Sequence, residues 1–249
     1  MAIVRSFPLA AVVALVAGGV NAGRPLTIDD AEPVAAGKSE LEMGLLFSKA
    51  PGERHVDLPA AFQYGLTPTF ELSAVWGAHL RNRLAEFNNE ASASGPADLA
   101  LGFKWMPVRT ATGVMFAVSG TVKLANGDEF KGLGTGDRDY DLTLIVTKQW
   151  DAFAIDVNLG RTWTGERFDT SLADIVRYGA ATRYSLKEPL TLVAEAFADD
   201  PKGAKAQWQA NVGFQYALRK NFVLDAAFGR KLNSSGPDSV ATIGFTATF

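Results

Sequence analysis

Apolar and polar residues alternate one by one along most of this chain. In residues 239–249 the odd-numbered positions from 241 onward are alanine, isoleucine or phenylalanine, and the even-numbered positions from 242 are threonine or glycine. A period of two residues is the signature of a β-strand with one apolar and one polar face. The pattern recurs from residue 39 onward and gives about twelve predicted strands, each roughly 10–12 residues long and able to cross a bilayer when tilted.

The connections between the predicted strands alternate in length. The short connections are residues 67–69, 107–112, 149–152, 187–189 and 219–221, and the longer, polar ones include 81–95, 125–137, 164–170 and 233–238. A soluble β-sandwich would also show alternating residues, but it has no reason to sort its loops by length. Outer-membrane barrels do, with short turns at the periplasmic rim. We therefore predict an all-β fold, a transmembrane antiparallel up-and-down β-barrel of about twelve strands with both termini periplasmic.

The beginning of the chain has the features of a cleavable signal peptide. Arg5 supplies a positive charge, residues 7–20 are mostly apolar, and the small residue Ala22 precedes Gly23. The apolar run is shorter than the ~20 residues that a membrane-spanning helix needs. Residues 1–22 are therefore the predicted signal peptide, and the protein is expected in the outer membrane of a Gram-negative-type bacterium.

The rest of the chain divides into two parts. Residues 23–38 show no alternation and are expected on the periplasmic side or in the barrel mouth, and residues 39–249 form the predicted barrel. The last strand ends at Phe249 and resembles the closing strand of bacterial outer-membrane barrels, whose terminal phenylalanine is part of the signal read by the assembly machinery. We expect membrane lipid, this machinery and small-molecule solutes as partners. A net charge of −3 without a basic run argues against nucleic acid.

Charged and amide residues share one face of the predicted strands. A charge facing hydrocarbon costs kilocalories, so the consistent spacing predicts a polar lumen. The residues predicted to line it are Glu40, Glu42, Asp57, Glu71, His79, Asp98, Lys104, Lys123, Asp141, Asp156, Arg177, Arg183, Glu195, Gln209, Asn211 and Asp225. A barrel of about twelve strands is intermediate between filled eight-stranded barrels and open porins of ~16–18 strands, so we expect a narrow lumen.

We predict a channel for the passive passage of small solutes, with no enzymatic activity, cofactor or metal ion. Two alternatives stay open. His79 is expected opposite Asp57, and His55 opposite Arg81, near the outer rim, where a histidine–carboxylate pair can act as a general base in a hydrolase. The barrel can also be a non-conducting structural or adhesive protein, with a lumen filled by ion pairs and with loops that bind a partner.

Three sequence features resemble a known family. They are the stretch from Arg24 to Ala31 (Arg-Pro-Leu-Thr-Ile-Asp-Asp-Ala), the Glu40-Leu41-Glu42 entry into the first strand, and the Tyr-Gly-Leu-Thr-Pro turn at residues 64–68. They are similar to the outer-membrane barrel family named for the MetA pathway of phenol degradation. The resemblance covers essentially the whole chain after residue 22. It implies an outer-membrane channel for the uptake of small aromatic or other apolar compounds.

Overall fold

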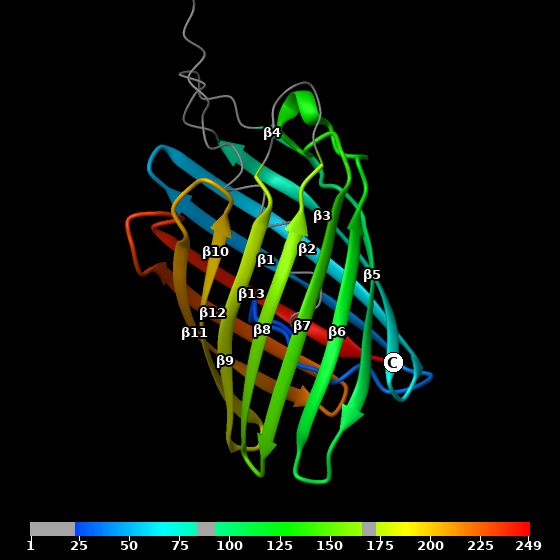
Figure 1. Cartoon of the computed structure of the whole chain (residues 1–249). Coiled ribbons are helices and arrows are strands. Elements are labelled where there is room, and N and C mark those ends of the chain that lie inside the picture. The colour runs from blue at the N-terminus through cyan, green and yellow to red at the C-terminus, as the bar shows by residue number, and fades with distance from the viewer. Residues whose placement is uncertain (1–22, 84–92, 166–172) are drawn as a thin grey trace, which may run out of the picture.

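The wall of the molecule is a single antiparallel sheet closed into a barrel (Figure 1). The computed structural model describes residues 23–83, 93–165 and 173–249. The strands are β1 (Ser39–Ala50), β2 (Glu53–Thr67), β3 (Phe70–Arg83), β4 (Ala93–Pro96), β5 (Ala100–Arg109), β6 (Val114–Lys123), β7 (Asp139–Trp150), β8 (Phe153–Trp163), β9 (Ile175–Lys187), β10 (Leu190–Pro201), β11 (Gln207–Arg219), β12 (Phe222–Lys231) and β13 (Ser239–Thr248).

Neighbouring strands along the chain pair with each other, apart from the short β4, which adds to one end of β3. The pairing of β1 with β13 closes the cylinder, in a register that places Met43 opposite Phe245 and Gly44 opposite Gly244. The wall therefore consists of twelve strands, the thirteen of the sheet without β4. The predicted up-and-down antiparallel barrel is confirmed.

The two ends of the barrel differ. The tight connections that follow β2, β5, β7, β9 and β11 lie at one end, which we call the turn end, together with the start of β1 and the end of β13. The other end, which we call the loop end, carries the longer connections and also the two-residue turn between β1 and β2. One of the longer connections contains η1 (Glu129–Lys131), a short 3-10 helix.

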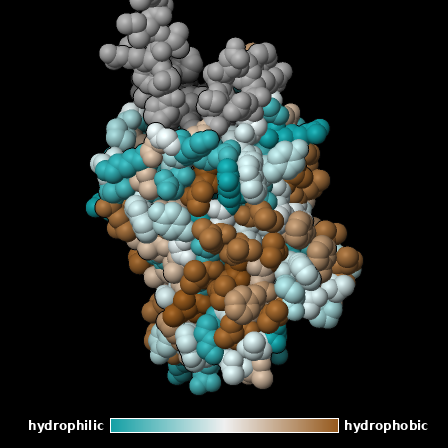
Figure 2. All heavy atoms as spheres, in the orientation of Figure 1, coloured by the Kyte–Doolittle hydropathy of each residue, from teal (hydrophilic) through white to brown (hydrophobic). Residues whose placement is uncertain are grey.

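The outer surface of the wall is apolar. Leu144, Val212 and Ile243 are 52%, 62% and 57% exposed, although each lies in the middle of a strand. Figure 2 shows that apolar side chains gather over the middle of the visible wall and hydrophilic ones toward its two ends. This distribution is that of a barrel whose apolar band contacts hydrocarbon. Within the described parts of the chain, no helix is long and apolar enough to cross a membrane.

Two predicted details differ from the structure. The expected loop 81–95 is shorter, because β3 continues to Arg83 and β4 pairs with β3. The expected pairing of His55 with Arg81 is wrong: a bulge between Val56 and Asp57 shifts the register, so His55 pairs with Asn82. An extra residue in one strand moves all later pairs by one position. The predicted signal peptide, residues 1–22, lies outside the described residues, as do residues 84–92 and 166–172.

Residues 23–38, which we call the inner segment, lie inside the barrel. Leu26 and Ile28 are buried against Ala181, Val193 and Phe197, which point inward from β9 and β10. Farther along, Ala31 is buried in a second apolar cluster with Met106, Met115, Ala117 and Ile145, from β5, β6 and β7. The buried core of this protein is thus formed between the inner segment and the inner wall.

Candidate functional site

The sixteen residues predicted to line the lumen are all buried or half-buried, and fifteen of them lie in wall strands; Asp98 lies in the connection between β4 and β5. Ten of them are buried: Glu42, Asp57, Glu71, Lys104, Lys123, Asp156, Glu195, Gln209, Asn211 and Asp225. Six are half-buried: Glu40, His79, Asp98, Asp141, Arg177 and Arg183. Buried polar groups need partners, and most of these partners come from the inner segment or from neighbouring inward side chains.

Arg24, near the start of the inner segment, is fixed to the wall where the barrel closes. Its Nε and Nη2 atoms donate to the two carboxylate oxygens of Asp225 at 3.3 and 3.2 Å, and Nη2 also donates to Thr242 Oγ1 at 2.7 Å. Such a paired contact between guanidinium and carboxylate combines charge with defined geometry. The guanidinium lies over Gly44 and Gly244, which face each other across β1 and β13. A Cβ on either glycine would overlap Nη2.

The next residues of the inner segment are held through their backbone. The amides of Thr27 and Ile28 both donate to Glu195 Oε2 at 2.8 Å. The side chain of Asn158 accepts from the amide of Asp29 and donates to its carbonyl, both at 2.8 Å. An irregular segment buried in a barrel has no strand partner for these groups. The inward side chains of β10 and β8 therefore supply the hydrogen bonds that a neighbouring strand would otherwise make.

The second half of the inner segment follows the wall toward the turn end. The amide of Ala31 donates to Thr147 Oγ1 of β7 at 2.8 Å, and that of Val34 donates to Glu71 Oε2 of β3 at 2.7 Å. Ala36 then forms a parallel bridge with Gly65 of β2. From Arg24 to Ala36 the partners thus lie on β12, β10, β8, β7, β3 and β2, so the inner segment runs around the inner wall before it enters β1.

Ion pairs join the acidic pair Asp29 and Asp30 to two different strands of the wall. Lys104 Nζ of β5 lies 3.0 Å from the carboxylate of Asp29, and Arg183 of β9 lies 3.1 Å from that of Asp30. Arg183 also contacts Asp156 of β8 at 3.0 Å. The buried carboxylates of Asp29 and Asp156 each have a cation beside them, which offsets the cost of burying their charge.

The remaining predicted lining residues form networks within the wall. Gln209 donates to Asn211, which donates to Glu195, and Arg177 contacts Asp199 through two hydrogen bonds of 2.6 and 2.9 Å. Asp141 accepts from the hydroxyls of Thr143 and Thr162. These hydrogen bonds hold the inward side chains of the wall in place.

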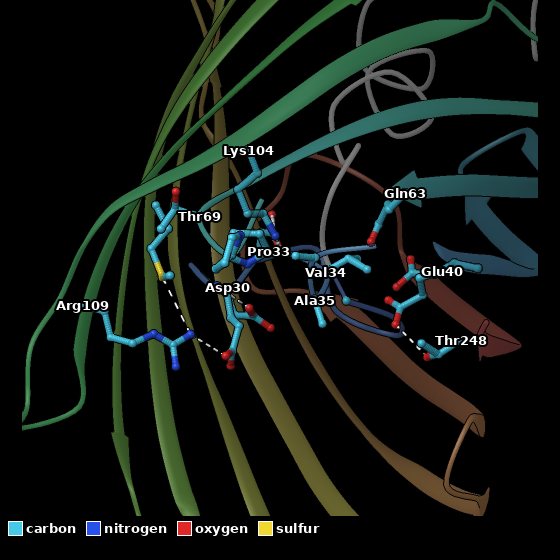
Figure 3. A pocket seen from close by; sticks show the side chains of 17 residues that line it. Asp30, Pro33, Val34, Ala35, Glu40, Gln63, Thr69, Lys104, Arg109 and Thr248 are labelled. Carbon is cyan, nitrogen blue, oxygen red and sulfur yellow. Dashed lines mark hydrogen bonds and ion pairs between the residues drawn. The ribbon is translucent and has the colours of Figure 1, made fainter. Parts of the chain in front are cut away.

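A cavity remains near the turn end, between the inner segment and the wall, with a volume of about 720 Å³. Figure 3 shows Asp30, Pro33 and Lys104 together on one part of its lining and Glu40 and Thr248 on another. The hydroxyl of Thr248 donates to Glu40 at 3.2 Å. The lining combines carboxylates, two cations and aliphatic groups of the inner segment, and the full set is Gly23, Asp29, Asp30, Glu32, Pro33, Val34, Ala35, Ala36, Glu40, Glu42, Gln63, Pro68, Thr69, Lys104, Met106, Arg109 and Thr248.

Polar clusters also occur at the loop end. His79 Nδ1 and Asp57 Oδ1 lie 2.7 Å apart in the predicted cross-strand pair. Asp98 accepts from Lys123 Nζ and from the backbone amides of Asn126, Gly127 and Thr135. Asp98 and Lys123 therefore fix the fold of the connection between β6 and β7.

On the connection that precedes β9, a hydrogen bond from Arg161 lowers the pKa of Asp174.

Sequence reasoning missed the inner segment as part of the lumen. The sequence places the stretch that contains Arg24, Asp29 and Asp30 on the periplasmic side or in the barrel mouth. One available signal was the number of charged residues predicted to face the lumen. Such residues need partners when they are buried, and a segment inside the lumen can supply them. Two strand glycines, Gly44 and Gly244, were a second signal, because glycine within a strand often marks close approach of another backbone or a ligand.

The chain belongs to the family described as "Putative MetA-pathway of phenol degradation", whose model matches residues 22–249. Among solved structures it is similar to an outer membrane channel from Pseudomonas putida F1, with 16% identity and a TM-score of 0.67, over 88% of this chain and 98% of that one. It is also similar to the NanC porin, with 8% identity and a TM-score of 0.63, over 82% and 98% of the two chains. A third similar structure is the KdgM porin, with 9% identity and a TM-score of 0.61, over 84% of this chain and 99% of that one. Comparison with curated protein sequences gives no match.

Proposed function

We propose that this protein is an outer-membrane channel for the passive passage of small solutes. The observation that carries the proposal is the 720 Å³ cavity left between the inner segment and the wall of a barrel with an apolar outer surface. Small eight-stranded barrels are filled by their own side chains. In this barrel a folded segment restricts the lumen but leaves a space large enough for a small organic molecule.

Small aromatic or other apolar compounds are the solute class that we favour. The inner segment contributes Pro33, Val34 and Ala35 to the cavity, and Met106 of β5 adds a further apolar side chain. Glu40 and Glu42 supply polar groups on the opposite part of the lining. The aliphatic groups would offer contact surface to the ring of a small organic solute, and the charged groups of the lining would orient its polar substituents. The description of the family supports the same class.

The orientation is part of the proposal. We place the turn end in the periplasm, because outer-membrane barrels have short periplasmic turns and longer outer loops. Both termini of the barrel, Ser39 and Phe249, then lie on the periplasmic side, where the assembly machinery would meet the last strand. Residues 1–22 are proposed to be removed as a signal peptide.

The test is solute flux into liposomes that contain the refolded mature protein. Phenolic acids are compared with sugars and amino acids of similar size, and empty liposomes give the background. Faster entry of the aromatic compounds is expected. An Arg24→Ala variant, in which the inner segment loses its contact with Asp225, is expected to raise flux of all solutes. If the folded wild-type protein and this variant both give no flux above the empty liposomes, the channel proposal is wrong and a structural or adhesive role gains weight.

A second candidate is a hydrolase at the outer rim, and the observation that favours it is the 2.7 Å contact between His79 and Asp57. A carboxylate that accepts from Nδ1–H would leave Nε2 of the histidine free to act as a general base. His79→Ala would abolish hydrolysis of ester substrates and leave solute flux unchanged. Absence of ester hydrolysis by wild-type protein in outer-membrane lipid would remove this candidate.

A further inference from the structure

Three cations lie side by side on the outer wall at the loop end. Arg230 of β12 is the register partner of Ser239 of β13, Ser239 is the partner of Lys49 of β1, and Lys49 is the partner of Arg54 of β2. All three cations are exposed and occupy the ends of their strands. Neighbouring strands are about 4.8 Å apart, so the row from Arg230 to Arg54 spans roughly 14 Å. We call these three residues the cation row.

Among the described residues, no carboxylate forms an ion pair with the cation row; Glu53 and Asp238, at the same rim, lie beside His55 and Lys231 instead. Like charges directly opposite each other in a sheet are destabilising, and Lys49 and Arg54 form such a pair. Some other cations at the loop end are balanced: Arg161 lies 2.8 Å from Asp174 and stacks on Trp163. The cation row is therefore a part of this rim where an external anion would relieve repulsion.

Apolar side chains lie directly beneath the cation row. Two residues farther into each strand, Phe228, Ala241, Phe47 and Val56 form a parallel row in the same register, and Phe228 and Phe47 are 48% and 42% exposed. The guanidinium of Arg230 lies 5.8 Å from the ring of Phe228. Cations above an apolar surface match an amphiphile that carries phosphate on its head group and acyl chains below it.

We infer that the cation row binds the phosphate groups of a phosphorylated glycolipid in the outer leaflet of the membrane. The acyl chains of this lipid lie along Phe228, Phe47 and their neighbours, and its phosphates accept hydrogen bonds from Arg230, Lys49 and Arg54. The inference rests on the outer-membrane location proposed above but does not depend on conduction. It gives the loop-end rim of β12, β13, β1 and β2 a defined lipid ligand.

The test measures binding of lipid A to the folded, mature protein in a neutral detergent by native mass spectrometry. Lipid A with both phosphates is compared with the same lipid after enzymatic removal of the phosphates. The test variant is Lys49→Gln/Arg54→Gln/Arg230→Gln. The matched control is Lys187→Gln/Arg219→Gln/Lys220→Gln, which removes three exposed cations at the turn end. Heat-modifiable migration on gels confirms that each protein is folded.

The wild-type protein and the turn-end control are expected to bind phosphorylated lipid A equally. The loop-end variant is expected to bind it about tenfold or more weakly, since each cation near a lipid phosphate contributes to affinity. Equal loss in both variants, or equal binding of the dephosphorylated lipid by wild-type protein, would overturn the inference. The comparison of the two lipids needs no variant, so the inference stays testable even if a substitution impairs folding. Solute flux is measured separately, so failure of the channel proposal would be recognised independently.

Discussion

Arg24 and Asp225 are 201 positions apart in the sequence, yet the guanidinium of one donates two hydrogen bonds to the carboxylate of the other inside the barrel. The side chain of Asp225 is 1% exposed and that of Arg24 is 11% exposed. This pair fixes the start of an irregular segment to the strands at which the cylinder closes. Loss of this contact would free the start of the inner segment from β12.

Arg24→Ala should destabilise the protein by about 3 kcal/mol, the order found when one partner of a buried ion pair is removed. The remaining carboxylate of Asp225 would stay buried without its cation. Urea unfolding in detergent measures the change, and a double-mutant cycle with Asp225→Ala isolates the coupling. If the two single variants and the double variant show additive losses, the pair is not coupled and the assignment of Arg24 as an anchor fails.

Gly44→Ala should release Arg24 without any change of charge. The new Cβ would occupy the space of the guanidinium and would also lie 2.6 Å from the carbonyl oxygen of Ile243. We expect single-channel conductance to rise, as we also expect for Arg24→Ala. In the Arg24→Ala background the same glycine substitution should add little, because the guanidinium is already absent. A full additional effect in that background would assign the change to the wall instead of the inner segment.

Ile28→Ala should lower stability by about 2–4 kcal/mol, since it removes a side chain that is 1% exposed in the apolar cluster with Phe197. Limited proteolysis should then cut the inner segment more readily. The matched control is Ile243→Ala, the same change at a residue that is 57% exposed on the outer wall. Comparable losses in both variants would show that the inner cluster does not hold the segment.

Single cysteines test the orientation, because the native chain contains none. Ala204→Cys places a thiol at the loop end and Ala152→Cys places one at the turn end, and both positions are exposed. A membrane-impermeant maleimide added to intact cells should label the first and spare the second, and both should react after lysis. Labelling of Ala152→Cys alone in intact cells would reverse the proposed orientation.

The mass of the protein purified from outer membranes should correspond to a chain that begins at Gly23. The backbone amide of Arg24 lies 3.4 Å from Glu42 Oε1, so cleavage before Gly23 would leave the new α-amino group near a buried carboxylate. Ala22→Leu, which replaces the small residue before the predicted cut, should cause the precursor to accumulate. A mass that corresponds to a chain with a different first residue would disprove the predicted cleavage site.

Periodicity predicted the strands and their inward faces because burial in a barrel leaves a two-residue pattern in each strand. It did not give the exact register. Asp57 was correctly placed opposite His79, but the bulge at Val56 and Asp57 moved His55 away from Arg81. The contacts of Arg24 were beyond prediction, because an irregular segment has no period and its partners lie far away in sequence. Turn lengths and local patterns carry no information about which inward carboxylate will receive a distant guanidinium.

The path of the inner segment also limits how its sequence can change. Its anchors at Arg24, Ile28, Ala31 and Val34 meet fixed positions on β12, β10, β7 and β3. An insertion or deletion of one residue between them would displace every anchor that follows, whereas the connections at the loop end can change length without disturbing the wall. An irregular stretch is thereby held to a constant length, a constraint otherwise expected of the strands themselves.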